Sequence, residues 1–250
     1  MKLCLKSFRD KKWHNKRMTR RPQSPLLSAH ESQLVVIDVQ ERLLPVIRDH
    51  LSVAASIRFL MDAAAILQVS TVVTEQYPKG LGPTVELLRN HPATVTTLEK
   101  LKFSAAETLT MDPSESSSST KEHSGSHAFG FNCRPAAQTV ASALEHPRAM
   151  AKQLVLVGIE THICVQQTAL ELFERGFQVF VAADCVGSRN AEDQKWALHR
   201  MADAGVIITT AEAIAFEWCE RAGNDSFKAL SRLVRERDAQ RIMTSASRVP

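Results

Sequence analysis

The chain has 250 residues, of which 44% are hydrophobic and 23% are charged, and this balance excludes gross disorder, collagen and a pure coiled coil. The longest apolar runs, residues 34–37 and 154–157, fall short of the about 18 to 20 residues that a membrane span needs, so we expect a soluble protein. The net charge of +4 is uneven, because residues 1–30 carry nine bases and one acid whereas the other 220 residues sum to −4.

The first segment along the chain is a basic arm, residues 1–30. It is nearly free of acids and has apolar residues among its bases, which is typical of a mitochondrial presequence; a solvated, disordered extension is the alternative. It lacks the apolar core of a secretory signal. The five cysteines are scattered and odd in number, which favours a reducing compartment over a disulfide framework. We therefore expect a mitochondrial or cytoplasmic protein.

Residues 31–220 alternate between β-branched apolar runs and segments of helical periodicity. The expected strands are residues 33–39, 70–74, 94–98, 153–158, 178–182 and 206–209. The expected helices are residues 52–68, 84–90, 136–144, 162–175, 191–204, 211–221 and 227–237. Six strands separated by helices predict a single three-layer α/β/α domain, Rossmann-like, with an open and mainly parallel sheet.

Two segments depart from this alternation. Residues 111–130 contain a serine-rich stretch without apolar periodicity, which predicts a disordered surface insertion within the domain. Residues 221–250 carry seven bases against three acids and are expected to form a C-terminal helix and a basic tail. The domain between the two basic ends, residues 31–220, therefore has a net charge of −8.

In a parallel open sheet, ligands bind at the carboxyl ends of the strands, so the reactive side chains that follow the expected strands are the candidates for chemistry. These side chains are Asp38, Glu75, Lys100, Cys164 and Asp184. Each of three candidates also has a structural interpretation without a function. Asp38 is then a turn residue, and Lys100 is a solvated lysine beside Lys102. Cys164 is then a small buried apolar residue.

Cys164 lies near the expected start of a helix, six residues beyond Gly158. The positive end of the helix dipole and the free backbone N–H groups there favour a thiolate, and Lys100 adds to this effect. We therefore expect the pKa of Cys164 to fall below the about 8.5 of a free cysteine. The same N–H groups are suited to an oxyanion hole for an attacked carbonyl.

Three separated motifs resemble the isochorismatase-like cysteine hydrolase superfamily. They are LVVIDVQERLLPVI around Asp38, EKLKFSA around Lys100, and VLVGIETHICVQQTALELFERGFQVFVAADCVGSR around Cys164. They occur in the order and spacing of that superfamily, and the similarity extends from about residue 33 to 220 without the serine-rich segment. The segment TEQYPKGLGPTV, residues 74–85, is most similar to the eukaryotic isochorismatase domain-containing proteins.

The resemblance implies a catalytic triad of Asp38, Lys100 and Cys164. Cys164 is then the nucleophile that forms a thioester, Asp38 the base, and Lys100 the cation that holds Asp38 ionised and Cys164 as thiolate; Lys102 is the alternative lysine. The resemblance also implies a cis peptide bond at Ile159–Glu160. It further implies an oxyanion hole formed by the backbone N–H groups of Glu160 and Cys164.

Several other residues lie near the expected site. Those that we expect to line a substrate pocket are Gln40, Glu75, Tyr77, Lys79, Phe103 and Thr161. The alternative role for Gln40 and Glu75 is to order Asp38. The alternative for Tyr77 and Lys79 is that they belong to an ordinary polar loop. His162 is two residues before Cys164, and we expect its side chain to point away from the thiol.

Departures from the superfamily limit the reaction. The segment after the second strand, TEQYPKGLG, lacks the histidines that bind metal in nicotinamidases, so we expect neither a catalytic metal nor another cofactor. Isochorismatases that cleave a vinyl ether do not use a cysteine at the position of Cys164. The sequence thus predicts a metal-independent cysteine hydrolase of a small amide or related acyl C–N bond.

Two other readings concern binding. The first is a catalytically quiet scaffold or binding protein that retains the fold. The second is an RNA-binding arm, which charge alone supports, so we do not expect a nucleic-acid partner. The resemblance implies a homo-oligomer, a dimer or tetramer, and no membrane partner is expected.

Overall fold

The computed structural model describes residues 24–110 and 151–246. Most of the basic arm, the serine-rich segment and the helix expected at residues 136–144 lie outside the described residues. Within the described parts, no helix combines the length and the apolar character that crossing a bilayer requires.

A single six-stranded sheet forms the centre of the domain, and all its strand pairs are parallel, which confirms the predicted architecture. The strands are β1 (Ser32–Ile37), β2 (Ser70–Gln76), β3 (Thr94–Lys100), β4 (Gln153–Ile159), β5 (Gln178–Gly187) and β6 (Ile207–Thr209). Their order in the sheet is β3-β2-β1-β4-β5-β6. The direction of winding therefore reverses between β1 and β4, and such a switch point is where open α/β sheets bind ligands.

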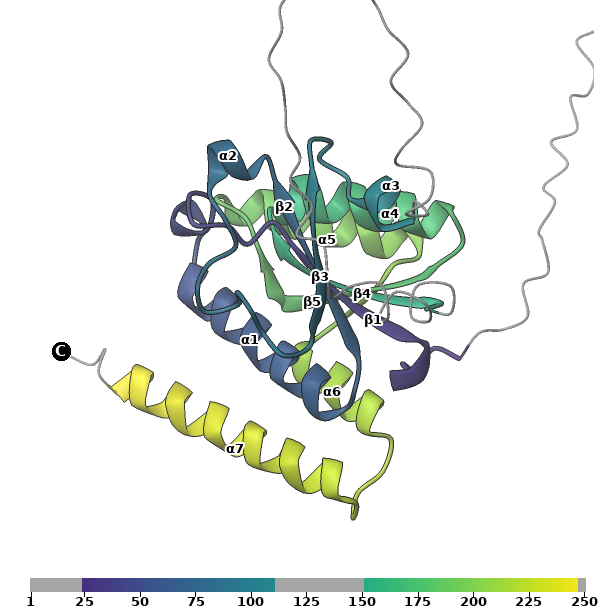
Figure 1. The fold of residues 1–250 in the computed structure, drawn as a ribbon, viewed down its shortest axis with the longest axis vertical. Helices are drawn as coiled ribbons and strands as arrows, with labels where there is room; N and C mark the ends of the chain where they lie inside the picture. Colours follow the sequence, from purple (N-terminus) through teal and green to yellow (C-terminus); the bar gives the residue numbers. More distant parts are fainter. Residues whose placement is uncertain (1–23, 111–150, 247–250) are drawn as a thin grey trace, which may run out of the picture.

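Helices cover both faces of the sheet (Figure 1). On one face lie α1 (His50–Ile66) and α6 (Ala211–Cys219), with α7 (Asp225–Ala246) packed outside them. On the other lie α3 (Ala106–Thr110), α4 (Gln166–Glu174) and α5 (Ala191–Ala204). The short helical turns are η1 (Ala29–Glu31), η2 (Leu44–Val46), α2 (Pro78–Leu81) and η3 (Thr161–Val165).

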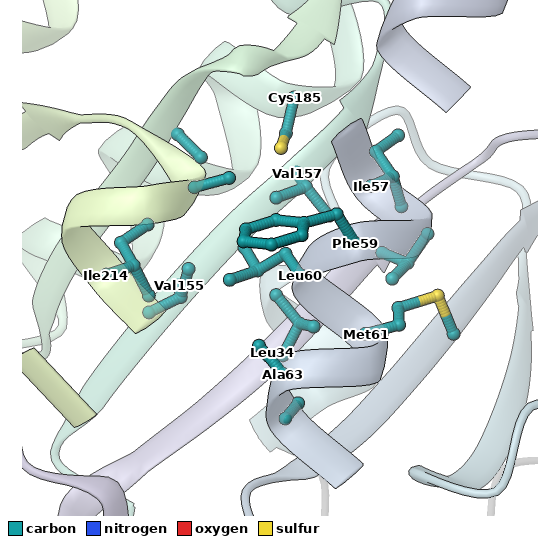
Figure 2. Close-up of a cluster of buried hydrophobic side chains, with 14 of the residues drawn as sticks. Leu34, Ile57, Phe59, Leu60, Met61, Ala63, Val155, Val157, Cys185 and Ile214 are labelled. Carbon is teal, nitrogen blue, oxygen red and sulfur yellow. The ribbon is translucent and has the colours of Figure 1, made fainter. Parts of the chain in front are cut away.

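The buried strand β1 divides the core in two, because successive side chains of a strand point to opposite faces of the sheet. Leu34 and Val36 belong to the apolar cluster beneath α1 and α6, whereas Val35 and Ile37 belong to the cluster beneath α4. Figure 2 shows the first cluster, where Phe59 of α1 packs among residues of β1, β4 and α6. A strand that is buried at every position is thus explained by a helix layer on each side.

Of the helices expected within residues 24–110 and 151–246, one is not formed. Residues 84–90, predicted to be helical, instead begin with an isolated bridge between Thr84 and Gln40 and continue as turns. A carboxylate oxygen of Glu75 accepts hydrogen bonds from both the backbone N–H of Thr84, at 2.6 Å, and its hydroxyl, at 2.7 Å. These contacts hold Thr84 in an extended conformation, so local helical periodicity is overridden by tertiary contacts.

The C-terminal helix is longer than the predicted residues 227–237, and a buried arginine holds it to the domain. Arg237 of α7 donates hydrogen bonds to Asp184 of β5 at 3.1 Å and to Ser56 of α1 at 3.2 Å. Its guanidinium also lies 4.1 Å from the centre of the Phe59 ring. The outer helix is therefore tied both to the sheet and to α1.

At Gly158, near the end of β4, the backbone of β1 leaves no room for a side chain. This glycine has a φ of +120°, and a Cβ atom added there would lie 2.1 Å from the carbonyl oxygen of Ile37. Because that oxygen belongs to the backbone of the neighbouring strand, it cannot turn aside as a flexible side chain would. Only glycine fits where the two strands leave the switch point.

We expect Gly158→Ala to lower the free energy of unfolding by more than about 3 kcal/mol or to prevent folding, because backbone strain and a backbone clash add together. Gly223→Ala is the matched control, since Gly223 has a φ of +95° and nothing within 4 Å of the added Cβ. It should cost only the strain of about 1 to 3 kcal/mol. Urea unfolding measures both; equal losses in the two variants would contradict the close approach.

Candidate active site

The three triad candidates lie at the carboxyl ends of the strands around the switch point. Asp38 follows β1 and has a φ of +54°, Lys100 is the last residue of β3, and Cys164 lies in η3, directly after β4. All three are buried, at 0%, 5% and 6% exposure. The sheet order thus brings together residues that are more than sixty positions apart in the sequence.

Asp38 and Lys100 form a buried ion pair, with 2.7 Å between Lys100 Nζ and Asp38 Oδ2. The other carboxylate oxygen, Oδ1, accepts a hydrogen bond of 2.8 Å from the hydroxyl of Thr74. Each oxygen of the carboxylate therefore has a polar partner, which compensates for the loss of water around a buried charge.

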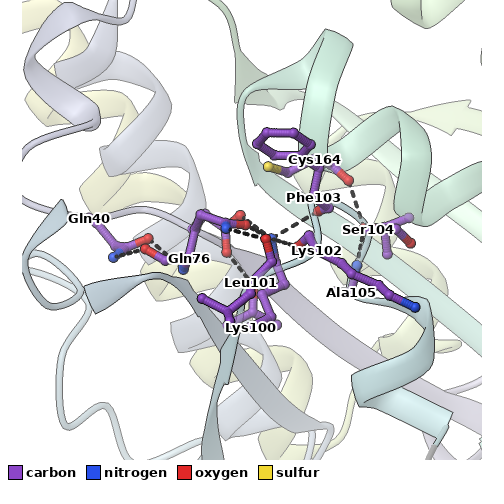
Figure 3. Close-up of polar contacts among 12 residues, drawn as sticks. Gln40, Gln76, Lys100, Leu101, Lys102, Phe103, Ser104, Ala105 and Cys164 are labelled. Carbon is purple, nitrogen blue, oxygen red and sulfur yellow. Dashed lines mark hydrogen bonds and ion pairs between the residues drawn. The ribbon is translucent and has the colours of Figure 1, made fainter. Parts of the chain in front are cut away.

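The ammonium of Lys100 is surrounded by oxygen atoms (Figure 3). Besides Asp38, it donates to the side-chain oxygen of Gln76 at 2.7 Å and to the carbonyl oxygens of Phe103 at 2.9 Å and Lys102 at 3.2 Å. Lys102 itself points outward, since its side chain is 74% exposed and pairs with Glu107. Of the two lysines that the sequence offered, only Lys100 contacts Asp38.

Cys164 stays protonated at neutral pH in the free site, which corrects the expectation of a lowered pKa. Burial is the main cause that raises the pKa of the Cys164 thiol to about 12. The charge of Asp38 and a hydrogen bond to it contribute to this increase, whereas Lys100 opposes it. The helix-start argument was therefore wrong, because it took no account of burial or of the neighbouring carboxylate. The geometry presents a neutral thiol to Asp38.

The turn that carries Cys164 is irregular. The peptide bond between Ile159 and Glu160 is cis, at the position that the family resemblance implies. The carbonyl oxygen of Glu160 accepts from the N–H groups of Ile163 at 3.1 Å and Val165 at 3.2 Å, and the chain continues from this turn into α4. The hydroxyl of Thr161 is fully buried and has no hydrogen-bond partner among the described residues.

The loop after β3, residues 101–105, connects the lysine to the cysteine. The hydroxyl of Thr168 in α4 donates to the carbonyl oxygen of Cys164 at 2.6 Å and accepts from the backbone N–H of Ala105 at 2.9 Å. Ser104 in the same loop donates to Glu171 of α4 at 2.8 Å. Helix α4, which follows the turn of Cys164, and the loop whose carbonyl oxygens bind the Lys100 ammonium are therefore fixed to each other.

The expected pocket residues have different positions. Tyr77 and Phe103 are 52% and 56% exposed, and Lys79 is exposed on α2. Gln40 is buried, and its amide binds the backbone of Gln76 and of Gly82, whereas the carboxylate of Asp38 is bound by Thr74 and Lys100.

Glu75 and His162 both have partners away from the triad. The carboxylate of Glu75 is engaged by Thr84, as described above, and not by Asp38. One ring nitrogen of His162 lies 3.0 Å from the hydroxyl of Ser188, so the side chain points away from the thiol as expected.

Thr74 and Gln76, which contact the ion pair, were not among the predicted site residues. The missed signal is the alternation along β2, because residues two apart in a strand share a face. Glu75 lies between them and points to the opposite face. Glu75 was predicted because it is charged and lies near the strand end, whereas its neutral neighbours Thr74 and Gln76 make the contacts.

The charge of Asp38 is one cause of the raised thiol pKa, so Asp38→Asn should lower the pKa of Cys164 from about 12. At pH 9 we expect Cys164 to be alkylated by iodoacetamide about tenfold faster in this variant, because the thiolate fraction rises although its nucleophilicity falls. Mass spectrometry of the Cys164 peptide measures the rate. Asp62→Asn, at an ion-paired aspartate of α1, is the control and should leave the rate unchanged. A wild-type midpoint at or below about 8.5 would contradict the protonated thiol.

Known proteins are similar to this chain over most of its length. Isochorismatase domain-containing protein 1 of Danio rerio is 32% identical over 209 residues, which cover 84% of this chain but 62% of that protein. Isochorismatase domain-containing protein 2 of the same species is 31% identical over 208 residues and is covered to 89%. The chain thus spans about three fifths of the length of the first of these relatives.

Solved structures give the same result. A structure described as MAR1 ribonuclease from Caenorhabditis elegans is 33% identical, with a TM-score of 0.64 over 84% of this chain and 92% of that one. YcaC from Pseudomonas aeruginosa shares the fold at 21% identity, with a TM-score of 0.64 over 90% and 98% of the two chains. The profile of the isochorismatase domain matches residues 32–213. The chain therefore belongs to the isochorismatase family.

Proposed function

We propose that the chain is a metal-independent cysteine hydrolase that cleaves a small amide or a related acyl C–N bond, with Cys164 as nucleophile, Asp38 as base and Lys100 as the supporting cation. The observation that carries this proposal is the position of Cys164, in the turn after β4, beside an Asp38 carboxylate whose charge is balanced by Lys100, at the switch point of the sheet. A thiol, a base and a group that orients the base are the parts that nucleophilic acyl transfer needs.

In the first half-reaction, the sulfur of Cys164 attacks the substrate carbonyl carbon while Asp38 takes the thiol proton. A C–S bond forms, and the carbonyl π electrons move to oxygen. The tetrahedral species then collapses, the C–N bond breaks, and Asp38 returns the proton to the leaving nitrogen. A thioester and a free amine or ammonia result. A thiol with a high pKa suits this step, because its proton leaves only when sulfur bonds to carbon.

Lys100 and the backbone stabilise the charges that this step creates. Lys100 remains within 2.7 Å of Asp38, so it offsets the carboxylate charge that must be regenerated in each cycle. We assign the backbone N–H groups of Glu160 and Cys164 to the oxyanion hole, since both lie on the turn that carries the nucleophile. In the second half-reaction, Asp38 takes a proton from water while the water oxygen attacks the thioester carbon. The C–S bond then breaks, Asp38 returns the proton to the sulfur of Cys164, and a carboxylic acid is released.

An activity on RNA is the second candidate, because the relative that is 33% identical is described as a ribonuclease. The charge of the domain argues against it. Residues 31–220 have a net charge of −8, whereas proteins that bind RNA neutralise phosphates with basic residues. The same set of variants distinguishes the two activities, because the thioester route requires the thiol of Cys164.

We expect Cys164→Ala to reduce turnover of any amide or ester substrate by at least about a thousandfold, since the covalent route is lost. A panel of small aliphatic and aromatic amides, activated esters and a single-stranded RNA should be assayed with the wild type, Cys164→Ala and Cys185→Ala. Cys185 is buried in the α1 cluster and is the matched control, which should retain activity. Cleavage of an amide that survives in Cys164→Ala would refute the proposal. Cleavage of RNA alone would assign the second activity, and a wholly inactive wild type would favour the scaffold.

A further inference from the structure

Gln76, the last residue of β2, joins the buried ion pair to the loop beside it. Its side-chain oxygen accepts a hydrogen bond of 2.7 Å from Lys100 Nζ, and its side-chain nitrogen donates one of 2.8 Å to the carbonyl oxygen of Leu101. Gln76 is 9% exposed, so water does not readily replace either partner. The amide has one orientation only, because an ammonium can only donate and a carbonyl oxygen can only accept.

The backbone of Gln76 is held as firmly as its side chain. Its N–H donates to the side-chain oxygen of Gln40 at 2.8 Å, and its carbonyl oxygen accepts from the side-chain nitrogen of Gln40 at 3.0 Å. Gln40 in turn donates to the carbonyl oxygen of Gly82 at 2.6 Å and is fully buried. The amide of Gln40 thus fixes the end of β2 against the chain that follows Asp38, as Figure 3 shows.

The position of Lys100 depends on Gln76 in two ways. Gln76 is itself one of the acceptors of the ammonium, and through Leu101 it holds the loop that supplies two further acceptors, the carbonyl oxygens of Lys102 and Phe103. Without Gln76, only Asp38 would hold the ammonium independently of that loop. The hydrogen bonds to Gln76, Lys102 and Phe103 match the three hydrogens of an ammonium, so their arrangement decides where its charge is directed.

We propose that Gln76 is a positioning residue for the reaction, which holds the Lys100 ammonium against Asp38 and fixes the 101–105 loop at the same time. This inference rests on the proposed function of the triad. A neutral amide suits the role, because it supplies an acceptor without a second negative charge. A glutamate there would compete with Asp38 for the ammonium, and the charge of Lys100 would then act less on the thiol and the base.

The test uses Gln76→Met, which keeps the size of the side chain but removes both hydrogen bonds, and Gln76→Glu, which keeps an acceptor but adds a charge. Gln153→Met is the matched control, because Gln153 is 3% exposed and hydrogen-bonded at the opposite end of the sheet, at the start of β4. Two measurements are needed: the NMR signal of the Lys100 ammonium with its slowly exchanging protons, and the burst of nitrophenolate when p-nitrophenyl acetate acylates Cys164 between pH 6 and 10.

We expect Gln76→Met to lose the Lys100 ammonium signal and to acylate about 10- to 100-fold more slowly, the range for loss of a hydrogen bond to a charged group. Gln76→Glu should keep the signal but remain slow, with its pH profile shifted to higher pH. Gln153→Met should match the wild type in both readouts even where its unfolding midpoint falls. A purely structural role would instead make Gln153→Met and Gln76→Met alike.

Two outcomes separate this inference from the proposed function. If Gln76→Met keeps both the Lys100 signal and the wild-type burst, Gln76 does not position the lysine and the inference is overturned, while the triad stands. If Gln76→Met loses the signal but the wild type shows no burst at Cys164, the positioning of Lys100 is supported and the hydrolase function fails.

Discussion

The site depends on one interaction, the buried ion pair between Asp38 and Lys100. Taking two charges out of water costs several kcal/mol for each ion, and the attraction between them offsets this only when their remaining polar atoms are also satisfied. Here the side chains of Asp38 and Lys100 are 0% and 1% exposed, and neighbouring residues satisfy their remaining polar atoms. Thr74 serves the carboxylate, whereas Gln76 and two loop carbonyl oxygens serve the ammonium. The ends of β1, β2 and β3 are thus organised around the charges.

A charged pair beside a neutral thiol also limits the side reactions of the cysteine. The thiolate is the form that is alkylated and oxidised, and a pKa of about 12 leaves little of it near neutral pH. In the proposed reaction, Cys164 therefore stays protonated until an acyl group lies close enough for proton transfer to Asp38. In the same proposal, the reactivity of the 6% exposed Cys164 arises during the attack and does not exist beforehand.

Periodicity and residue type sufficed to predict the sheet, its parallel pairing and the convergence of Asp38, Lys100 and Cys164 at one edge. The reason is that these follow from burial and from the geometry of strands and crossovers, which are local or topological. Two further features could not be predicted because they depend on tertiary contacts. One is the pKa of Cys164, which is set by burial and the distance to a carboxylate. The other is the role of Gln76, a neutral side chain whose two hydrogen bonds become visible only in the folded chain.

The helix α7 lies beyond the region that the isochorismatase domain profile matches, yet Arg237 inserts between Asp184, Ser56 and the Phe59 ring. With α7 outside α1 and α6, the described domain has four layers instead of three. A chain that ended at residue 220 would leave the carboxylate of Asp184 without its cation and the aromatic face of Phe59 without its cover. A neighbouring molecule that approaches this side meets α7 before α1, so the helix defines the outer surface that the molecule presents there.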